Sequence, residues 1–402
     1  AGKLEYTQNL QYFNGNAKAK DNPTVQRWPE IDAFKFKDAV PGTPLEFEGS
    51  AKYDYFSREA GTTGHRLKLN PSLSLPLASD WVTVIPSAGF NHMLYLGTDQ
   101  ENLGNQTLKN GVTAGNSTND DSTQARSWFD TDVTAFSEFY RVFQFDPGES
   151  LTPTAENVGN SEWIAMKHSV IPRLDYQYSP NFTGQDKYPA YDELDRPLGV
   201  NKLTYSLTNV IDRKARTVTL AGKGEDAEPT LSESYLDVFR LRLEQSYDAN
   251  EATRTVDRDK YRRRPFSDLM AEIVLQPMGG VTLTSKTYYS PYLGAVTEHE
   301  HLLRYEREGV GAAWVGYDYQ DEIDEYTRSR EEPMGILRLG GDVYITHNLL
   351  LGLEFRHDMW TGENLEKTIR LTWLNDCWNL GLELSATPTD TSVGFTINLM
   401  QF

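Results

Sequence analysis

A strict alternation of apolar and polar residues over long segments constrains this chain more than any other feature. In residues 45–55 apolar or small side chains occupy the odd positions, and polar or charged side chains occupy the even ones. Residues 66–77 and 378–384 repeat the pattern, with leucines along one side. Because successive side chains of a strand point to opposite faces, each segment predicts a β-strand with one apolar and one polar face.

The length of the alternating segments indicates where such strands would lie. The alternation lasts about nine to eleven residues, the length of a tilted membrane strand, whereas strands of soluble sheets average roughly five to six. The 402 residues contain no convincing helical apolar pattern, and no stretch approaches the roughly 18 to 20 apolar residues of a membrane helix. We therefore predict an all-β fold, a transmembrane antiparallel outer-membrane β-barrel with roughly sixteen to eighteen strands in this chain.

The predicted connections between strands are unequal in length. Tight turns are expected at Asn348 and Asp376, and we expect Pro71, Pro86 and Pro172 to interrupt strand pairing because proline lacks the ladder donor. Short turns at one end and long loops at the other are typical of outer-membrane barrels. The long polar stretches are residues 97–124, 146–160, 181–199, 213–233 and 247–264.

Composition narrows the classes of partner. The formal net charge of −19 argues against nucleic acid, since phosphate binding needs a basic face. Acidity is compatible with solvated loops, a polar lumen or a cation-binding surface. The 22 tyrosines fit aromatic girdles at membrane interfaces, and they equally fit a carbohydrate-binding all-β protein.

Two clusters could bind metal ions. His299 and His301 share one face of a predicted strand, so their imidazoles could hold one ion, but no third ligand is evident nearby. The acidic stretch 318–332 offers carboxylate oxygens, yet its spacing fits no calcium loop and a solvated surface loop explains it. The basic run 260–264 could meet lipid phosphates or pair with neighbouring acidic loops. We predict no metal site.

Two adjacent pairs, His357 with Asp358 and His168 with Ser169, contain residue types used by hydrolases. Neighbouring residues of a strand point to opposite faces, so neither pair forms a catalytic dyad by itself. We therefore predict no catalytic residue, no cofactor and no enzymatic activity.

Several stretches occur in an order that is similar to a known family. They include Pro172-Arg173-Leu174-Asp175-Tyr176-Gln177-Tyr178, then residues 185–186 and 191–196, Asn201-Lys202-Leu203-Thr204-Tyr205-Ser206-Leu207-Thr208, residues 263–269, residues 376–380, and residues 66–71 followed by Pro76. Together they span about residues 31–402, and they resemble LptD, the lipopolysaccharide-assembly or organic-solvent-tolerance family. The resemblance implies that residues 1–402 are the C-terminal part of a larger barrel, of about twenty-six strands, and that the periplasmic jelly roll of the family is absent from this chain.

The resemblance also implies a function. The family receives lipopolysaccharide from a periplasmic transport bridge and inserts it into the outer leaflet of the Gram-negative outer membrane. The lipoprotein LptE plugs the barrel, and the barrel-assembly machinery would insert the chain. The alternatives are a porin-like diffusion channel, with the same alternation, and a secreted all-β protein that binds or hydrolyses carbohydrate.

The end of the chain contains the remaining candidate residues. We expect Val393, Phe395, Ile397 and Leu399 to form the lipid-facing side of the last strand, which would also contain the barrel-assembly signal. A lone cysteine, here Cys377, can be a small buried hydrophobe or can pair with a cysteine elsewhere. In the LptD family, cysteines at this turn bond to cysteines of the periplasmic domain, which implies a disulfide from Cys377 to a residue outside this chain. Asp376 occupies the place where many members have a further cysteine.

Overall fold

A computed structural model gives the fold. It describes residues 2–5, 24–58, 62–99, 106–107, 113–114, 121–145, 151–222, 227–277, 279–375 and 377–399. Asp376 and Phe402 lie outside the described residues, as does most of the polar stretch 97–124.

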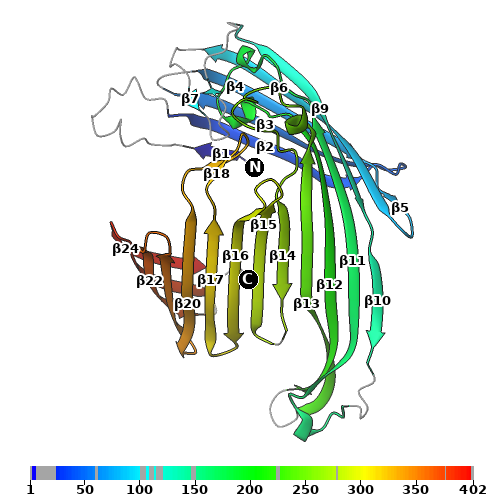
Figure 1. Ribbon diagram of the computed structural model, residues 1–402, viewed down its shortest axis with the longest axis vertical. Helices are drawn as coiled ribbons and strands as arrows, with labels where there is room; N and C mark the ends of the chain where they lie inside the picture. The colour runs from blue at the N-terminus through cyan, green and yellow to red at the C-terminus, as the bar shows by residue number, and fades with distance from the viewer. Residues whose placement is uncertain are drawn as a thin grey trace. The chain divides into compact units, whose positions relative to one another are not determined.

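The described residues form an almost entirely antiparallel β structure, which confirms the predicted fold class (Figure 1). Twenty of the strands in this part of the chain belong to one sheet. Two of them are short, β1 with four residues and β5 with two. The remaining long strands agree with the number expected from the alternation, although the segment 66–77 is divided between β4 and β5.

The chain forms two compact units. The first contains Ala1–Phe136, Leu174–Thr204 and Asp248–Thr253. Its strands pair in chain order as neighbouring hairpins, as Figure 1 shows for the blue and cyan strands. They are β1 (Gly2–Glu5), β2 (Gln26–Ala39), β3 (Glu46–Ser57), β4 (Thr63–Ser74), β5 (Leu77–Ala78), β6 (Thr83–Asp99) and β9 (Gln124–Phe136), with the small hairpin β7 (Gln106–Thr107) and β8 (Thr113–Ala114).

The second unit contains Ser137–Arg173, Tyr205–Tyr247 and Arg254–Phe402, so β11 and β12 contribute residues to both units. The longer strands of this unit are β10 (Phe139–Gln144), β11 (Ser161–Ser179), β12 (Val200–Ala221), β13 (Glu228–Asp248), β14 (Leu269–Leu275), β15 (Val281–Ser290), β16 (Ala295–Arg307), β17 (Gly311–Gln320), β20 (Met334–Thr346), β21 (Leu349–Asp358), β22 (Asn364–Leu374), β23 (Trp378–Ala386) and β24 (Thr391–Leu399). The hairpin of β18 (Ile323–Asp324) and β19 (Ser329–Arg330) follows β17.

Within the described residues, helical structure is confined to short turns. They are η2 (Ala155–Asn157), η3 (Gln185–Lys187), η4 (Glu193–Asp195) and α2 (Ala249–Thr253). In the described part of the chain, no helix has the length and apolar character needed to cross a bilayer.

The strand register of the second unit aligns its apolar residues into two offset rows on one face. Leu303 faces Val315, which faces Leu339 on the next strand. The second row begins two residues away on β21, where Leu353 faces Ile369, and it continues through Leu384 to Val393. These seven side chains are 41–69% exposed. Their side of the sheet is called the apolar face below, and the opposite side, on which charged residues alternate with them, is called the charged face.

The connections at the two ends of the strands differ in length, although not entirely as expected. In the second unit β16–β17 and β20–β21 are joined by short turns at one end, and the predicted turn at Asn348 is confirmed. The longer connections 254–268 and 321–333 lie at the other end. The prediction that long connections share that end was wrong for residues 151–160, because the antiparallel order places them at the short-turn end.

The polar stretch 213–233 was also assigned wrongly, since most of it extends strands β12 and β13. Charged side chains pair across the two strands, with Lys214 Nζ 2.6 Å from a Glu233 carboxylate oxygen and Arg216 3.8 Å from the other. Opposite charges on neighbouring strands stabilise a hairpin without an apolar face. A polar sequence is therefore not sufficient to predict a loop.

Pro71 and Pro172 interrupt pairing as predicted, whereas Pro86 stays paired with Val133 in the unbroken β6–β9 ladder. The β4–β6 ladder pairs Leu69 and Ser72 but omits Pro71 between them. Pro172 of β11 lies beside the break between β9 and β10, where its carbonyl accepts a hydrogen bond from Ser137 N–H. Both interruptions follow from the missing N–H of proline.

Candidate functional site

Arg66 is the centre of a buried charge cluster in the first unit. Its side chain, on β4, is wholly buried. Its Nη1 donates to Asp192 Oδ1 at 2.6 Å and to Asp195 Oδ1 at 3.1 Å, and its Nη2 donates to Asp54 Oδ2 at 2.7 Å and to Asp192 Oδ2 at 3.0 Å. The planar guanidinium suits such forked contacts with carboxylates. One strand residue thereby binds β3 and a connection that is remote in sequence.

The connection between β11 and β12 forms a short capped turn at these aspartates. Asp192 is the N-cap of η4 and accepts from Leu194 N–H at 3.0 Å. Asp195 closes the capping box by accepting from Asp192 N–H at 3.1 Å and from Tyr191 N–H at 2.7 Å. Two acidic residues three positions apart suit this reciprocal arrangement, which satisfies backbone donors at the start of the turn. Residues 188–196 are called the clamped segment below.

Aromatic rings complete the attachment of the clamped segment. Tyr191 stacks on Phe56 of β3 with ring centroids 4.4 Å apart, and the Arg66 guanidinium lies 4.8 Å from the centre of the Phe56 ring. Tyr95 of β6 donates its hydroxyl hydrogen to Asp195 Oδ1 at 2.9 Å. Arg196 donates to carbonyl oxygens within the segment itself. Buried polar groups are tolerated here because they hydrogen-bond one another.

The ionisation of Asp192 follows from these contacts. Burial alone would raise the pKa of Asp192, but hydrogen bonds from Arg66 and the charges of Arg66 and Arg27 hold it below its ordinary value. A lowered pKa means that the pairing contributes stability at neutral pH and loses it as the pH falls through the lowered value. The clamped segment is thus bound by an ionised carboxylate.

The charged face of the second unit has a series of ion pairs. Arg338 Nε lies 2.8 Å from an Asp318 carboxylate oxygen. Further along, Arg356 pairs with Glu366 at 3.3 Å and Arg370 with Glu383 at 2.8 Å. These side chains are partly exposed. The sheet therefore presents guanidinium groups and carboxylates to solvent on one side.

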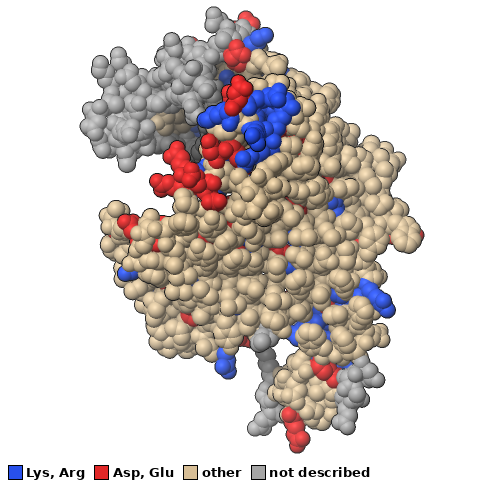
Figure 2. Space-filling view, viewed as in Figure 1, with Lys and Arg blue, Asp and Glu red and all other residues tan. Residues whose placement is uncertain are grey.

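The apolar face of the same unit ends in aromatic residues. His299 and His301 stack with ring centroids 4.6 Å apart, and Tyr319 lies 5.0 Å from His299. Trp373 and Trp378 lie on the same face toward the short-turn end. Aromatic residues at both edges of an apolar band are typical of membrane strands. Figure 2 shows few charged side chains over β13–β17.

The sequence candidates for metal binding are placed as follows. His299 and His301 do come together, with tyrosine neighbours. Among the described residues, no group of three or more His, Cys, Asp or Glu side chains is arranged to hold a metal ion.

The basic run and the acidic stretch contact each other directly. Arg264 forms an ion pair with Glu325. Arg328 pairs with Glu325 at 2.7 Å and with Asp268 at 2.8 Å. Of the two alternatives for the basic run, pairing with a neighbouring acidic loop is the one that the structure shows for Arg264.

The two histidine pairs that were considered for catalysis have separate partners. His357 Nδ1 lies 3.0 Å from Asn364 Oδ1, while Asp358 accepts from Trp360 N–H. Ser169 donates to Glu138 at 2.9 Å. Neither pair contains a histidine hydrogen-bonded to its neighbour in sequence.

The structure places the residues predicted near the C-terminus without testing their roles. Cys377 is exposed, its thiol is free in this chain, and its N–H donates to Asn375 Oδ1 at 3.3 Å. Val393, Phe395, Ile397 and Leu399 are 61–80% exposed. They continue the apolar face, because Leu384 faces Val393 and Leu382 faces Phe395.

Sequence reasoning missed the Arg66 cluster as a unit. Residues 66–71 and 191–196 were noted only as separate stretches of a family resemblance. The one local signal for a buried cationic partner was a polar turn that contains two aspartates close to tyrosines. Alternation cannot supply the partner, because Arg66 and Asp192 are distant in sequence.

Comparison with known families decides the assignment. The chain matches the model of LptD, described as LPS transport system D, over residues 2–349. The chain belongs to the LptD family. LptD is a transport family of the outer membrane and not an enzyme family, so the chain is an integral outer-membrane β-barrel protein of a Gram-negative bacterium.

Similar solved structures are outer-membrane receptors. The ferric enterobactin receptor of Pseudomonas aeruginosa shares 9% identity at a TM-score of 0.39, and the alignment covers 96% of this chain and 62% of that one. The siderophore receptor PiuA of Acinetobacter baumannii shares 10% identity at a TM-score of 0.29, with 93% and 62% covered. The LptD-family chain thus spans less than two thirds of these receptors. No curated protein sequence matches it.

Proposed function

We propose that the chain forms part of the barrel wall of the translocon that inserts lipopolysaccharide into the outer leaflet of the outer membrane. Membership of the LptD family supports a role in lipopolysaccharide transport. The observation that carries the proposal is the two-sided sheet, in which one face is an exposed apolar row and the other an ion-paired polar surface. A wall with these faces can contact lipid outside and a phosphorylated sugar headgroup inside.

The charged face has chemistry suited to that substrate. Lipopolysaccharide carries phosphates and sugars at its headgroup, and guanidinium groups bind phosphate with charge-assisted, often forked hydrogen bonds. Arg338, Arg356 and Arg370 lie on consecutive strands and are partly exposed. Their carboxylate partners keep the surface from holding an anion too firmly, because each guanidinium is already paired.

The proposal includes the partners implied by the family. The lipoprotein LptE would plug the barrel, a periplasmic bridge would deliver lipopolysaccharide, and the barrel-assembly machinery would recognise the last strand. Covalent chemistry is not required of any residue, because the substrate is moved and not converted.

Depletion of the protein tests the proposal. We expect loss of surface lipopolysaccharide, measured by labelling of intact cells, and increased sensitivity to hydrophobic antibiotics. Normal surface lipopolysaccharide combined with reduced uptake of small polar solutes would support the porin-like alternative instead. Depletion of an unrelated porin is the matched control, because it should change solute uptake without changing surface lipopolysaccharide.

A further inference from the structure

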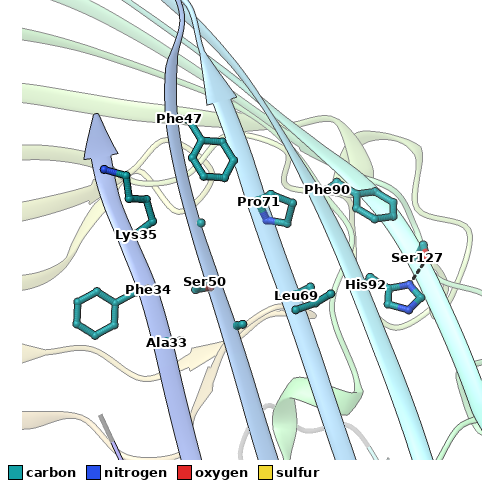
Figure 3. Close-up of a pocket in the computed structure, with 12 residues that line it drawn as sticks. Ala33, Phe34, Lys35, Phe47, Ser50, Leu69, Pro71, Phe90, His92 and Ser127 are labelled. Carbon is teal, nitrogen blue, oxygen red and sulfur yellow. Dashed lines mark hydrogen bonds between the residues drawn. The ribbon is translucent and has the colours of Figure 1, made fainter. Parts of the chain in front are cut away.

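A groove of about 900 Å³ crosses strands β2, β3, β4, β6 and β9 of the first unit (Figure 3). Its volume lies in the range of roughly 300–1,000 Å³ that is typical of small-molecule sites. The lining includes the small residues Gly49 and Ala51. It also includes the larger side chains Phe47, Leu69 and Phe90. The lining is mostly apolar, so the groove suits a hydrocarbon ligand.

The groove has its low floor where the small residues Gly49 and Ala51 of β3 lie. Ala51 faces Ala33 on one side and Leu69 on the other, and Gly49 faces Lys35 and Pro71. A Cβ added at Gly49 would lie 3.3 Å from Phe47 Cζ, so glycine lets the Phe47 ring lie against its own strand. The surface is therefore low along β3, beside the side chains of Leu69 and Pro71 on β4.

The groove opens on the side of the sheet opposite the Arg66 cluster. Along β3, Gly49 and Ala51 alternate with Lys52 and Asp54, and along β4 Leu69 alternates with Arg66, Lys68 and Asn70. Alternation assigns the groove to the opposite face from Arg66 and Asp54. In an integral outer-membrane sheet with its charges on one side, this opposite side is the one that contacts the bilayer. The groove is therefore continuous with the lipid interface.

Lys35 provides a cationic group at the margin of the groove. Its ammonium lies 2.8 Å from Asp38, and its side chain remains 56% exposed. An ammonium has three donors, so the contact with Asp38 leaves donors for a phosphate oxygen. Lys35 also lies near the short turn 40–45 that joins β2 to β3, and short turns of outer-membrane barrels are periplasmic.

We propose that this groove binds a phospholipid of the periplasmic leaflet, with one acyl chain over Gly49 and Ala51 and the phosphate at Lys35. The apolar lining accounts for the acyl chain and the charge of Lys35 for the anionic headgroup. Lys35 lies at the end of β2 near the short turn, which is the periplasmic end, and this position assigns the lipid to the periplasmic leaflet. This site is separate from the charged face that is proposed to serve lipopolysaccharide transport, so either proposal can fail alone.

Photo-crosslinking of the intact protein in vesicles tests the site. The vesicles contain phosphatidylethanolamine and phosphatidylglycerol, with a trace of phosphatidylglycerol that has a diazirine on one acyl chain. Cross-linked residues are mapped by mass spectrometry. We expect several-fold more cross-links at residues 33–51 than at the apolar strand residues 393–399. Uniform labelling of both segments would overturn the proposal.

Matched variants separate the contribution of the apolar groove from that of the Lys35 charge. Ala51→Leu fills the groove and should remove most of the excess labelling, whereas Ala125→Leu adds the same volume to an exposed position of β9 and should leave it unchanged. Lys35→Gln should abolish the preference for the phosphatidylglycerol probe over a diacylglycerol probe, which lacks phosphate. Heat-modifiable mobility confirms that each variant is folded. Displacement by excess lipopolysaccharide but not by unlabelled phosphatidylglycerol would refute the choice of phospholipid.

Discussion

Arg66 shows how a single buried residue can determine the conformation of a connection between strands. Without its guanidinium, Asp54 and Asp195 would be wholly buried carboxylates that lack their main cationic partner. Desolvating a charge is costly unless it is paired, so the arginine and the aspartates require one another. The clamped segment keeps its turn because that requirement is met only in this arrangement.

Replacement of this arginine should therefore be costly. Arg66→Met should lower the free energy of unfolding by about 3 to 5 kcal/mol, because it leaves buried carboxylates unpaired. The measurement is the urea midpoint of the intact protein in lipid vesicles, followed by tryptophan fluorescence. Arg370→Met is the matched control, since its pair with Glu383 is about half exposed and such pairs contribute about 0 to 1 kcal/mol. Equal midpoints for the two variants would contradict this account of the cluster.

Cys377 gives a second prediction for a single residue. It is exposed, at the short turn before β23, and a free thiol in an oxidising compartment tends to find a partner. Following the family resemblance, we expect a disulfide with a cysteine outside this chain. Thiol labelling of the full-length protein before and after reduction measures it, with a Cys377→Ser variant as the blank. Complete labelling of Cys377 without reduction, in correctly assembled protein, would show that the disulfide does not form.

At the scale of the element, β24 is the strand whose two faces differ most clearly in sequence. Its odd-numbered apolar residues continue the apolar face of β23, and its even-numbered residues include Ser392, Thr396 and Asn398. Ile397→Arg should impair insertion, because an arginine on the lipid face is destabilising, at a cost of about 2 to 4 kcal/mol at the bilayer midplane that falls toward the interfaces. Thr396→Arg, on the other face, should assemble normally. Folded protein is measured by heat-modifiable mobility, and normal assembly of Ile397→Arg would show that this face does not meet lipid.

Most elements of the whole molecule could be predicted from alternation, and the exceptions have physical causes. The segment 45–55 became β3 and residues 378–384 became part of β23, because one apolar face is enough to specify a strand and its orientation. The hairpin of β12 and β13 was missed where cross-strand ion pairs such as Lys214–Glu233 replace apolar contacts. The Arg66 cluster was missed because it joins residues far apart in sequence. The groove at Gly49 was missed because it depends on the register that sets which residues of neighbouring strands lie beside Gly49 and Ala51.

The transport of lipopolysaccharide as a property of the whole molecule can be tested through the charged face. A variant that combines Arg338→Gln, Arg356→Gln and Arg370→Gln should reduce surface lipopolysaccharide, because it removes the groups proposed to contact headgroup phosphates. Each lost ion pair is partly exposed and costs about 0 to 1 kcal/mol, so the amount of folded protein should change little.

The matched control for this prediction is the triple lysine variant at the same three positions. It retains the charge but not the forked geometry of guanidinium, so surface lipopolysaccharide should lie between the values for the parent and the glutamine variant. Both quantities, surface lipopolysaccharide and heat-modifiable protein, are measured in the same cells, because only their ratio separates transport from assembly. If the glutamine variant delivered as much lipopolysaccharide per folded molecule as the parent, the charged face would not be the path of the headgroup.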